Sequence, residues 1–296
     1  MNNTKKNQFS LFKLIIFIVL MVYSVSIIYI LFFAGMTSIK PHRNFDVDQN
    51  YVGLPSAVDI SNYTVVFKNF FIADPMYPWI KIGFFEQLLY TILYAGGGCL
   101  LTAIAPLLMS YACSKFEYKF NEVISVLVIV TMIVPIVGGS TSMISVLHQF
   151  QLYNTIFGVY CEKFIFANMY FLIYLGILRG IPSSFAEAAY MDGASEVRVF
   201  TQIMIPMVKN VFWTIALIFF IAYWNDYQTP LLYMPSYPTL AYGVYSLTVN
   251  TSASLGLNYK TVQMAASMAL ILPILILFVI FKDKIMGNLT MGGEKE

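Results

Sequence analysis

The chain has 296 residues, of which 59% are hydrophobic and only 11% are charged. Soluble domains carry about 25% charged residues, so this composition excludes an ordinary soluble domain and indicates a protein of the cell membrane. The formal net charge of +2 is not gathered into a basic patch, and we therefore expect no nucleic-acid partner.

The first apolar run spans residues 14–34 and follows a short tail, residues 1–13. Its length of about 21 residues exceeds the apolar region of a signal peptide, which is roughly 7–15 residues long. No small-x-small cleavage site follows it, and the run is long enough to cross a hydrocarbon core of about 30 Å. We predict a retained first transmembrane helix.

A polar interval, residues 35–85, separates this run from the next one. Its clearest pattern lies between Asn62 and Asn69 and predicts a short amphipathic helix that begins near Ser61. Five further apolar runs follow, at about residues 86–112, 122–147, 157–179, 208–233 and 261–281. The predicted fold class is therefore all-α, a polytopic membrane protein with six transmembrane helices.

Lysines and arginines predict the orientation of these helices. With a cytoplasmic N-terminus, most of the 17 basic residues fall in cytoplasmic segments: Lys5, Lys6, Lys13, Lys115, Lys119, Arg179, Arg198, Lys209, Lys282, Lys284 and Lys295. The positive-inside rule favours this arrangement. It places the tails, residues 1–13 and 282–296, in the cytoplasm and the loop of residues 35–85 outside. Within the transmembrane core, residues 86–281, a polar loop at residues 182–206 is then cytoplasmic.

The sequence shows no set of residues for catalysis. His42 and His148 are far apart, and the three cysteines, Cys99, Cys113 and Cys161, lack metal-ligand spacing and are expected to pack in apolar surroundings. It contains no zinc-binding His-Glu-x-x-His motif, nucleophile elbow or phosphate-binding loop. We predict a protein that is not an enzyme and has no catalytic residue, cofactor or metal. An energy source must lie in another chain or in an ion gradient.

The polar loop, residues 182–206, reads as two short helices separated by a glycine. Pro182 suits a first helical turn, and Ser184 with Glu187 three residues later predicts a capping box. Asp192 and Gly193 are expected to end this helix, because glycine readily adopts the left-handed conformation found at helix ends.

A second helix is predicted to follow, with Val197, Phe200 and Met204 on one face and an end before Pro206. Taken alone, these residues leave two interpretations open. The helix pair lies on the lipid headgroups, with Glu187 only capping a helix, or it binds a soluble partner.

The spacing in this loop resembles the EAA loop of ABC importer permeases. The residues that carry the likeness are Glu187-Ala188-Ala189, Asp192-Gly193, Ile203 and Pro206. Other segments resemble the binding-protein-dependent carbohydrate importers, and most closely the smaller, six-span permease of maltose-type pairs: Asn62-Tyr63, Tyr111–Phe116, Trp224–Pro230 and Met286–Gly293. Asn121 and the pair Tyr227-Gln228 depart from the family pattern.

This resemblance implies a type I ABC importer permease fold and a set of partners. These are a second, larger permease that completes a heterodimer, two cytoplasmic ATP-binding subunits, an extracytoplasmic solute-binding protein, a carbohydrate solute and membrane lipid. It also implies roles within the loop. Glu187 would pair with a cation of the ATPase, Ala188 and Ala189 would permit close docking, and Gly193 would set the bend.

Candidates for the solute pathway lie at the end of the fifth run. Polar groups inside spans usually face a bundle interior, which favours Asn225, Asp226 and Gln228. Trp224 and Tyr227 would stack on a sugar ring. The alternative is structural, because aromatic residues gather at membrane interfaces and Asn225 and Asp226 would cap or pair helices.

Two other classes of function remain open, an ion-coupled secondary transporter and a non-transporting membrane scaffold. An ion-coupled carrier predicts carboxylates near the membrane centre and inverted repeats. Charged residues here lie mainly at the ends of the apolar runs. Glu162 and Lys163 are adjacent, so we expect them to point to different helix faces at the outer interface, where they need not pair.

Overall fold

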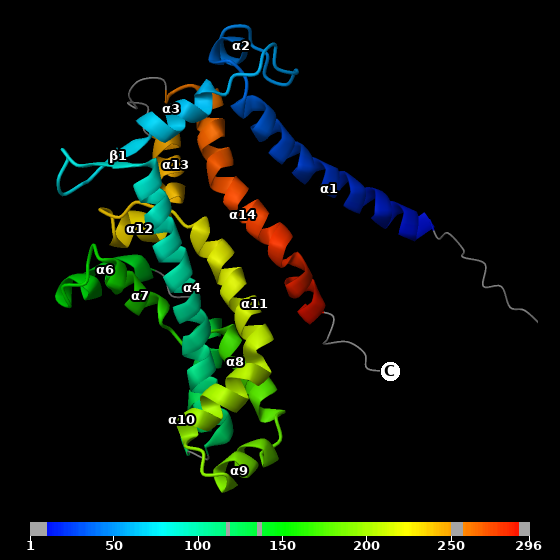
Figure 1. Ribbon diagram of the computed structural model, residues 1–296, viewed down its shortest axis with the longest axis vertical. Coiled ribbons are helices and arrows are strands. Elements are labelled where there is room, and N and C mark those ends of the chain that lie inside the picture. Colours follow the sequence, from blue (N-terminus) through cyan, green and yellow to red (C-terminus); the bar gives the residue numbers. More distant parts are fainter. Residues whose placement is uncertain (1–10, 117–118, 135–137, 250–256, 290–296) are drawn as a thin grey trace, which may run out of the picture. The chain divides into compact units, whose positions relative to one another are not determined.

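The computed structural model describes residues 11–116, 119–134, 138–249 and 257–289 (Figure 1). Most of them are helical, as the all-α class predicts. The described strands are β1 (Phe71–Ala73) and β2 (Lys81–Gly83), which form a small antiparallel hairpin. The tail residues 1–10 and 290–296, with the end of the Met286–Gly293 motif, lie outside the described residues. The helices are α1 (Leu11–Ser38), α2 (His42–Asp46), α3 (Ser61–Asn69), α4 (Phe84–Lys115), α5 (Asn121–Ile133), α6 (Gly139–Gln149), α7 (Ile156–Lys163), α8 (Met169–Arg179), α9 (Ser184–Met191), α10 (Glu196–Val199), a π-helical turn (Phe200–Met204), α11 (Ile205–Trp224), α12 (Gln228–Tyr233), α13 (Leu240–Val249) and α14 (Lys260–Leu289).

Within the described ranges, four helical segments are long and apolar enough to cross a membrane. They are α1, α4, the continuous helix Glu196–Trp224 and the first part of α14, Lys260–Leu277. The pair α8 and α9 is bent by 68° and makes a fifth segment only if it is one broken span. The count of six spans therefore stays a prediction.

Three of the predicted runs are interrupted, contrary to the expectation of single helices. Run 122–147 is divided between α5 and α6, and run 157–179 between α7 and α8. Asn168 restarts the chain as α8, because its side-chain oxygen accepts a hydrogen bond from the backbone N–H of Tyr170 at 3.0 Å. Run 208–233 ends as a helix at Trp224, and α12 is separate.

The described residues form two compact parts, each with its own contacts. The first part contains the residues up to Phe70 together with those between Leu247 and Ile271. At its centre the amide of Asn62, in the predicted helix α3, donates hydrogen bonds to the carbonyls of Ser38 and Lys40 at 2.9 and 2.8 Å. The Tyr63 hydroxyl lies 2.8 Å from that of Ser38. The motif pair Asn62-Tyr63 thus fastens the end of α1 to α3.

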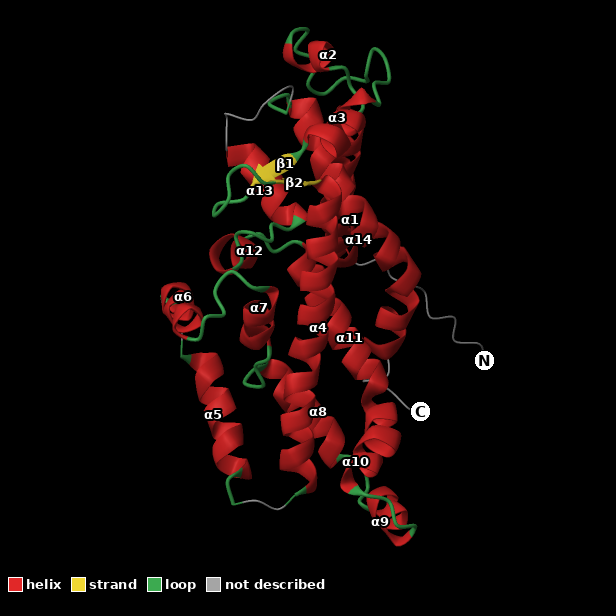
Figure 2. Cartoon of the chain, turned by 60° about the vertical axis from the view of Figure 1, so that its left-hand side comes forward, coloured by secondary structure: helices red, strands yellow, loops and turns green. Residues whose placement is uncertain are grey.

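In the second part, which contains Phe71 to Ser246, α4 packs against α8 and α11 (Figures 1 and 2). Glycine lets α11 approach, since a Cβ on Gly98 would lie 3.2 Å from the ring of Tyr223. Helix α5 runs beside α8 (Figure 2), and its Val128 is buried in a cluster with Cys113 of α4 and Phe171 of α8. Cys99 and Cys113 are buried as predicted, whereas Cys161 is exposed on α7, so the expectation that it packs is wrong.

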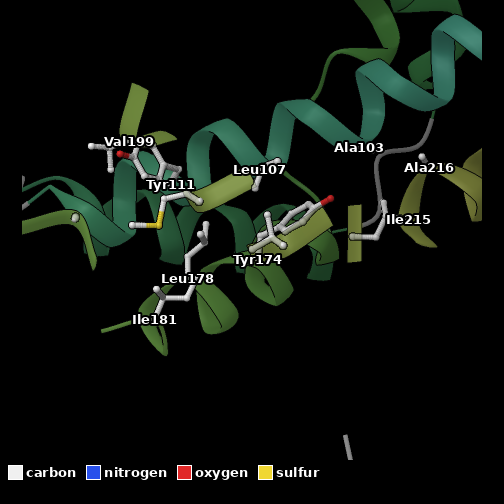
Figure 3. Close-up of a cluster of buried hydrophobic side chains, with 12 residues drawn as sticks. Ala103, Leu107, Tyr111, Tyr174, Leu178, Ile181, Val199, Ile215 and Ala216 are labelled. Atoms are coloured by element: carbon white, nitrogen blue, oxygen red, sulfur yellow. The ribbon is translucent and has the colours of Figure 1, made fainter. Parts of the chain in front are cut away.

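A buried apolar cluster joins α4, α8 and α11 to the loop of residues 182–206 (Figure 3). The side chains of Tyr174, Leu178 and Met204 have no exposed surface. Ala186 from α9 and Val199 from α10 belong to the same cluster. The loop is therefore not detached from the helices that it connects, because it contributes side chains to their core.

Candidate functional site

Helix α9 starts differently from the predicted capping box. The residue before it is Ser183, whose backbone is already helical at φ −63° and ψ −25° and whose side chain makes no capping hydrogen bond. A side-chain cap requires a non-helical backbone at the capping residue, which Ser183 does not have. Because α9 begins at Ser184, Ser184 and Glu187 both lie inside the helix. The Glu187 side chain is exposed, and within the described part of the chain its carboxylate makes no hydrogen bond or ion pair.

The end of α9 confirms the expected break at Asp192 and Gly193. Gly193 has φ +78°, and its N–H donates to the carbonyl of Tyr190 at 3.0 Å. The N–H of Ala194 donates to the carbonyl of Ala189 at 2.9 Å. This pair of bonds is a Schellman motif, which needs a left-handed residue at the position of Gly193.

The second helix differs from its prediction in register and in length. Val197 is 71% exposed, and Val199 takes its expected place in the core beside Met204. These two residues are five apart, the spacing that the π-helical turn brings onto one face. The helix also continues through Pro206 into α11, which begins one residue earlier at Ile205, directly after the π-helical turn Phe200–Met204.

The loop of residues 182–206 has an exposed surface that contains a shallow hollow. Ala188 and Pro206 are exposed, and a hollow of about 220 Å³ lies between the end of α9 and the following helix. Three of the predicted motif residues line it, together with three residues that the sequence did not single out: Ala189, Asp192 and Ile203 with Ala194, Arg198 and Gln202. Arg198 Nε donates to Gln202 Oε1 at 2.9 Å on this lining.

Two hydrogen bonds brace the loop. Lys115 Nζ, at the end of α4, donates to the carbonyl of Ile181 at 2.9 Å. Tyr190 Oη donates to Glu196 Oε2 at 2.7 Å and so joins α9 to α10. Burial and the Glu196 carboxylate raise the pKa of Tyr190 above its ordinary value. The sequence gives no signal for the first bond, because its partners are 66 positions apart.

The five candidates for the solute pathway differ in how firmly packing and hydrogen bonds fix their side chains. Asp226 Oδ2 accepts a hydrogen bond from Tyr94 Oη at 2.6 Å, and Asp226 Oδ1 accepts one from the N–H of Gln228 at 2.9 Å. Trp224 is 3% exposed, and Tyr227 stacks on Tyr245 at a ring distance of 4.2 Å.

Asn225 and Gln228 are the two candidates with exposed side chains. The Asn225 amide donates to the carbonyl of Ile221 in its own helix at 2.9 Å. A local bond of this kind uses the amide nitrogen and leaves the amide oxygen available as an acceptor. Of the five candidates, these two are therefore best placed to meet a solute without a change in packing.

Glu162 and Lys163 form an ion pair, which their adjacent positions in the sequence did not require. Lys163 Nζ lies 3.1 Å from Glu162 Oε2, with side chains only 11% and 19% exposed. Helix α7 ends at Lys163, so no following helical turn fixes the directions of these two long side chains. The ammonium lies 4.6 Å from the ring centre of Tyr223, and Thr102 Oγ1 donates to the Lys163 carbonyl at 3.1 Å.

Comparison with known proteins identifies the class to which this fold and loop belong. Residues 102–286 match the family described as "Binding-protein-dependent transport system inner membrane component". That match covers more than half of the chain, and the chain belongs to this family. It is accordingly a multi-pass membrane protein, and its curated relatives are transport permeases, not enzymes.

Among curated relatives, the arabinooligosaccharides transport system permease protein AraQ of Bacillus subtilis is 26% identical over 97% of this chain and 98% of its own. The trehalose/maltose transport system permease protein MalG of Thermococcus litoralis is 25% identical, with coverage of 85% and 88%. A bacterial ABC transporter involved in the import of the acidic polysaccharide alginate matches with a TM-score of 0.74 at 21% identity, covering 92% of this chain and 95% of that one. This likeness shows a shared ABC permease fold.

Proposed function

We propose that the chain is the permease subunit of an ABC importer that moves a sugar or an oligosaccharide into the cell. Relatives that match most of the chain are named for arabinooligosaccharides and for trehalose and maltose. A third relative, MelC of Bacillus subtilis, is named for melibiose, raffinose and stachyose and is 26% identical over 73% of this chain. These names share short oligosaccharides, the solute class that we propose.

The proposed assembly contains a second, larger permease, two cytoplasmic ATP-binding subunits and an extracytoplasmic solute-binding protein. The family description names dependence on a binding protein. A further matching structure, with a TM-score of 0.56 and 14% identity, is an alginate ABC transporter in complex with a periplasmic protein bound to an alginate pentasaccharide. We keep the predicted topology for this subunit, with cytoplasmic termini, an outer loop at residues 35–85 and a core at residues 86–281.

The observation that carries the proposal is the braced, open surface of residues 182–206. Glu187 and Ala188 are exposed on α9, beside the hollow lined by Ala189, Asp192 and Ile203. A cationic residue of an ATP-binding subunit would pair with Glu187, which has no partner within the described chain. Movement of the loop would then pass into α11, because the helix from Glu196 to Trp224 is continuous.

The solute pathway is the second element of the proposal. Asn225 and Gln228 would touch the solute, since their side chains are exposed. Asp226, Trp224 and Tyr227 would shape the wall, because their side chains are held by hydrogen bonds, burial and ring stacking.

Substitution of the loop tests the proposal directly. Glu187→Lys reverses the exposed charge, and Gly193→Leu places a branched side chain where φ is +78°. Both variants should reach the membrane but abolish uptake of radiolabelled oligosaccharide. Ser184→Ala is the matched control, because this exposed residue caps nothing. Normal uptake and normal co-purification of the ATP-binding subunit in both loop variants would contradict the proposal.

One observation favours a second candidate function, an ion-coupled carrier. Lys163, which pairs with Glu162, and Asp226 both lie beside Tyr94 of the membrane-span candidate α4, and a carrier would place ionisable groups within its spans. Inhibition of uptake by vanadate and not by a protonophore supports the ABC importer, and the reverse supports the carrier. A non-transporting scaffold would show no solute-dependent stimulation of ATP hydrolysis in the assembled complex.

A further inference from the structure

The hairpin between β1 and β2 has an apolar tip whose side chains stay exposed, although the Asn154 amide donates to Met76 Sδ at 3.0 Å. Every residue from 75 to 81 is exposed. The indole of Trp79 is 75% exposed, and Met76 and Tyr77 beside it are 60% and 49% exposed. Exposed apolar surface gathered in one place usually marks a contact with a partner or a membrane.

The tip is held in shape before any contact is made. The Asp74 carboxylate, itself buried, accepts hydrogen bonds from the N–H groups of Met76 and Tyr77 at 2.7 and 3.2 Å and from Ser236 Oγ at 2.9 Å. The Asn154 amide donates to Ser236 Oγ at 2.8 Å. Segments that are distant in the sequence therefore brace the hairpin, and ordering in advance lowers the entropy lost on binding.

The tip is continuous with the apolar face of a candidate membrane span. Strand β2 leads directly into α4, whose first turn is fixed by Glu86 Oε2, which accepts a hydrogen bond from the N–H of Gly83 at 2.8 Å. On α4 the exposed side chains begin at once with Phe85 at 67% and continue with Leu89 at 53%. Trp79 thus lies only a few residues before the point where this apolar face starts.

The chemistry of the tip fits the boundary between lipid tails and water. Indole and phenol rings favour the headgroup level, where one part of the ring is dry and the polar group is wet. The tip also carries one exposed cation, Lys81, whereas the Asp74 carboxylate is buried. The Lys81 ammonium lies 4.4 Å from the ring centre of Phe71. An exposed ammonium of this kind is attracted to anionic headgroups.

We propose that residues 75–81 insert into the headgroup layer of the membrane and anchor the first turn of α4 there. The ligand class is a phospholipid headgroup, with the rings of Tyr77 and Trp79 among the glycerol and carbonyl groups and Lys81 on a phosphate. This anchor would fix the height at which α4 enters the bilayer.

The chain's three tryptophans, Trp79, Trp213 and Trp224, allow a direct test by fluorescence. The full-length chain with Trp213→Phe and Trp224→Phe keeps only Trp79. It is placed in vesicles of phosphatidylcholine with a minor share of phosphatidylglycerol, brominated either near the headgroup or deep in the chains. Lipids brominated near the headgroup should quench more than half of the Trp79 fluorescence, and lipids brominated deep in the chains should quench less. Aqueous iodide should quench little of it.

The other tryptophans supply matched controls. A chain that keeps only Trp213, which is 61% exposed on the apolar helix α11, should be quenched by deep bromines. A chain that keeps only Trp224, which is 3% exposed, should respond weakly to both. If the double variants do not fold, the difference between the wild type and Trp79→Phe reports the same quenching.

Quenching of Trp79 by iodide without any effect of brominated lipid would overturn the anchor. That result would place the tip in water, as a surface for a soluble partner. A further variant, Lys81→Glu in the Trp79-only chain, should weaken the quenching by lipid in vesicles with anionic headgroups. Unchanged quenching in this variant would contradict the role given to Lys81.

Discussion

Gly193 and Tyr190 fix the end of α9 by different physical means. Gly193 supplies a backbone conformation at φ +78° that other residues adopt only at a cost, and nothing lies within 4 Å of the place where a Cβ would stand. The cost of a side chain there is therefore conformational and does not come from a clash. Tyr190 supplies a hydroxyl that reaches Glu196 in the next helix.

Gly193→Ala should consequently disturb the loop through its backbone alone. A left-handed conformation costs an L-residue about 1–2 kcal/mol, so the Schellman end should loosen and uptake should fall. Gly176→Ala is the control, since a Cβ there also meets open space but the residue lies within α8. Alanine stabilises a helix interior by roughly 0.5–1 kcal/mol relative to glycine. Thermal unfolding and uptake that change equally in both variants would contradict this account.

Tyr190→Phe removes one hydroxyl and should uncouple transport from ATP hydrolysis. The ATP-binding subunit should still co-purify, because the exposed face of α9 is unchanged, while uptake per ATP hydrolysed falls. Glu196→Gln, which keeps an acceptor, should retain more coupling. A Tyr190→Phe variant with wild-type uptake per ATP would show that this bond does not transmit motion.

The same bond predicts a pH dependence. The pKa of Tyr190 is raised, so the folded state favours the neutral phenol more than the unfolded state does. Its stabilising contribution is complete below the ordinary tyrosine pKa of about 10 and is lost as the pH rises through the raised value. Uptake per ATP hydrolysed by the wild type should therefore not change with pH across the neutral range.

At the scale of elements, the apolar runs were reliable indicators of helix and poor indicators of continuity. Runs 14–34 and 86–112 correspond to the long helices α1 and α4. The breaks between α7 and α8 and between α11 and α12 depend on side-chain bonds such as those of Asn168 and Asp226. Hydropathy averages over such residues, so a run alone does not show where a helix restarts.

Asp226 lies at one of these restarts, and its loss should act through the elements that it joins. Asp226→Ala removes the carboxylate that accepts hydrogen bonds from the first N–H groups of α12, those of Gln228 and Thr229, a loss of about 1 kcal/mol. It also leaves the Tyr94 hydroxyl without its acceptor, which costs roughly a further 1–3 kcal/mol. The unfolding midpoint in detergent should fall clearly. Asn225→Ala, whose amide bonds only within its own helix, should weaken solute-stimulated ATP hydrolysis with little change in that midpoint. Equal midpoints for the two variants would exclude a structural role for Asp226.

At the scale of the whole chain, what the sequence could predict depended on whether the signal is local. Composition indicates a membrane protein, and the fixed spacing from Glu187 to Pro206 indicates the family that the comparison then identified. The bond from Lys115 to Ile181 and the contact of Tyr94 with Asp226 join residues 66 and 132 positions apart. Such pairs arise from packing, so no single segment could reveal them.

The predicted orientation of the chain in the membrane can be tested by a single labelling experiment. Val58, in the loop predicted to be outside, and Val197, in the loop predicted to be cytoplasmic, are 66% and 71% exposed. Each is changed to cysteine in a Cys161→Ser background, because the native Cys161 is exposed and Cys99 and Cys113 are buried. In intact cells a membrane-impermeant maleimide should label the cysteine at position 58 at once. It should label the one at position 197 only after the cells are opened, since the excess of basic residues predicts a cytoplasmic position for that side. Labelling in the reverse order would invert the topology and remove loop 182–206 from the reach of any cytoplasmic ATPase.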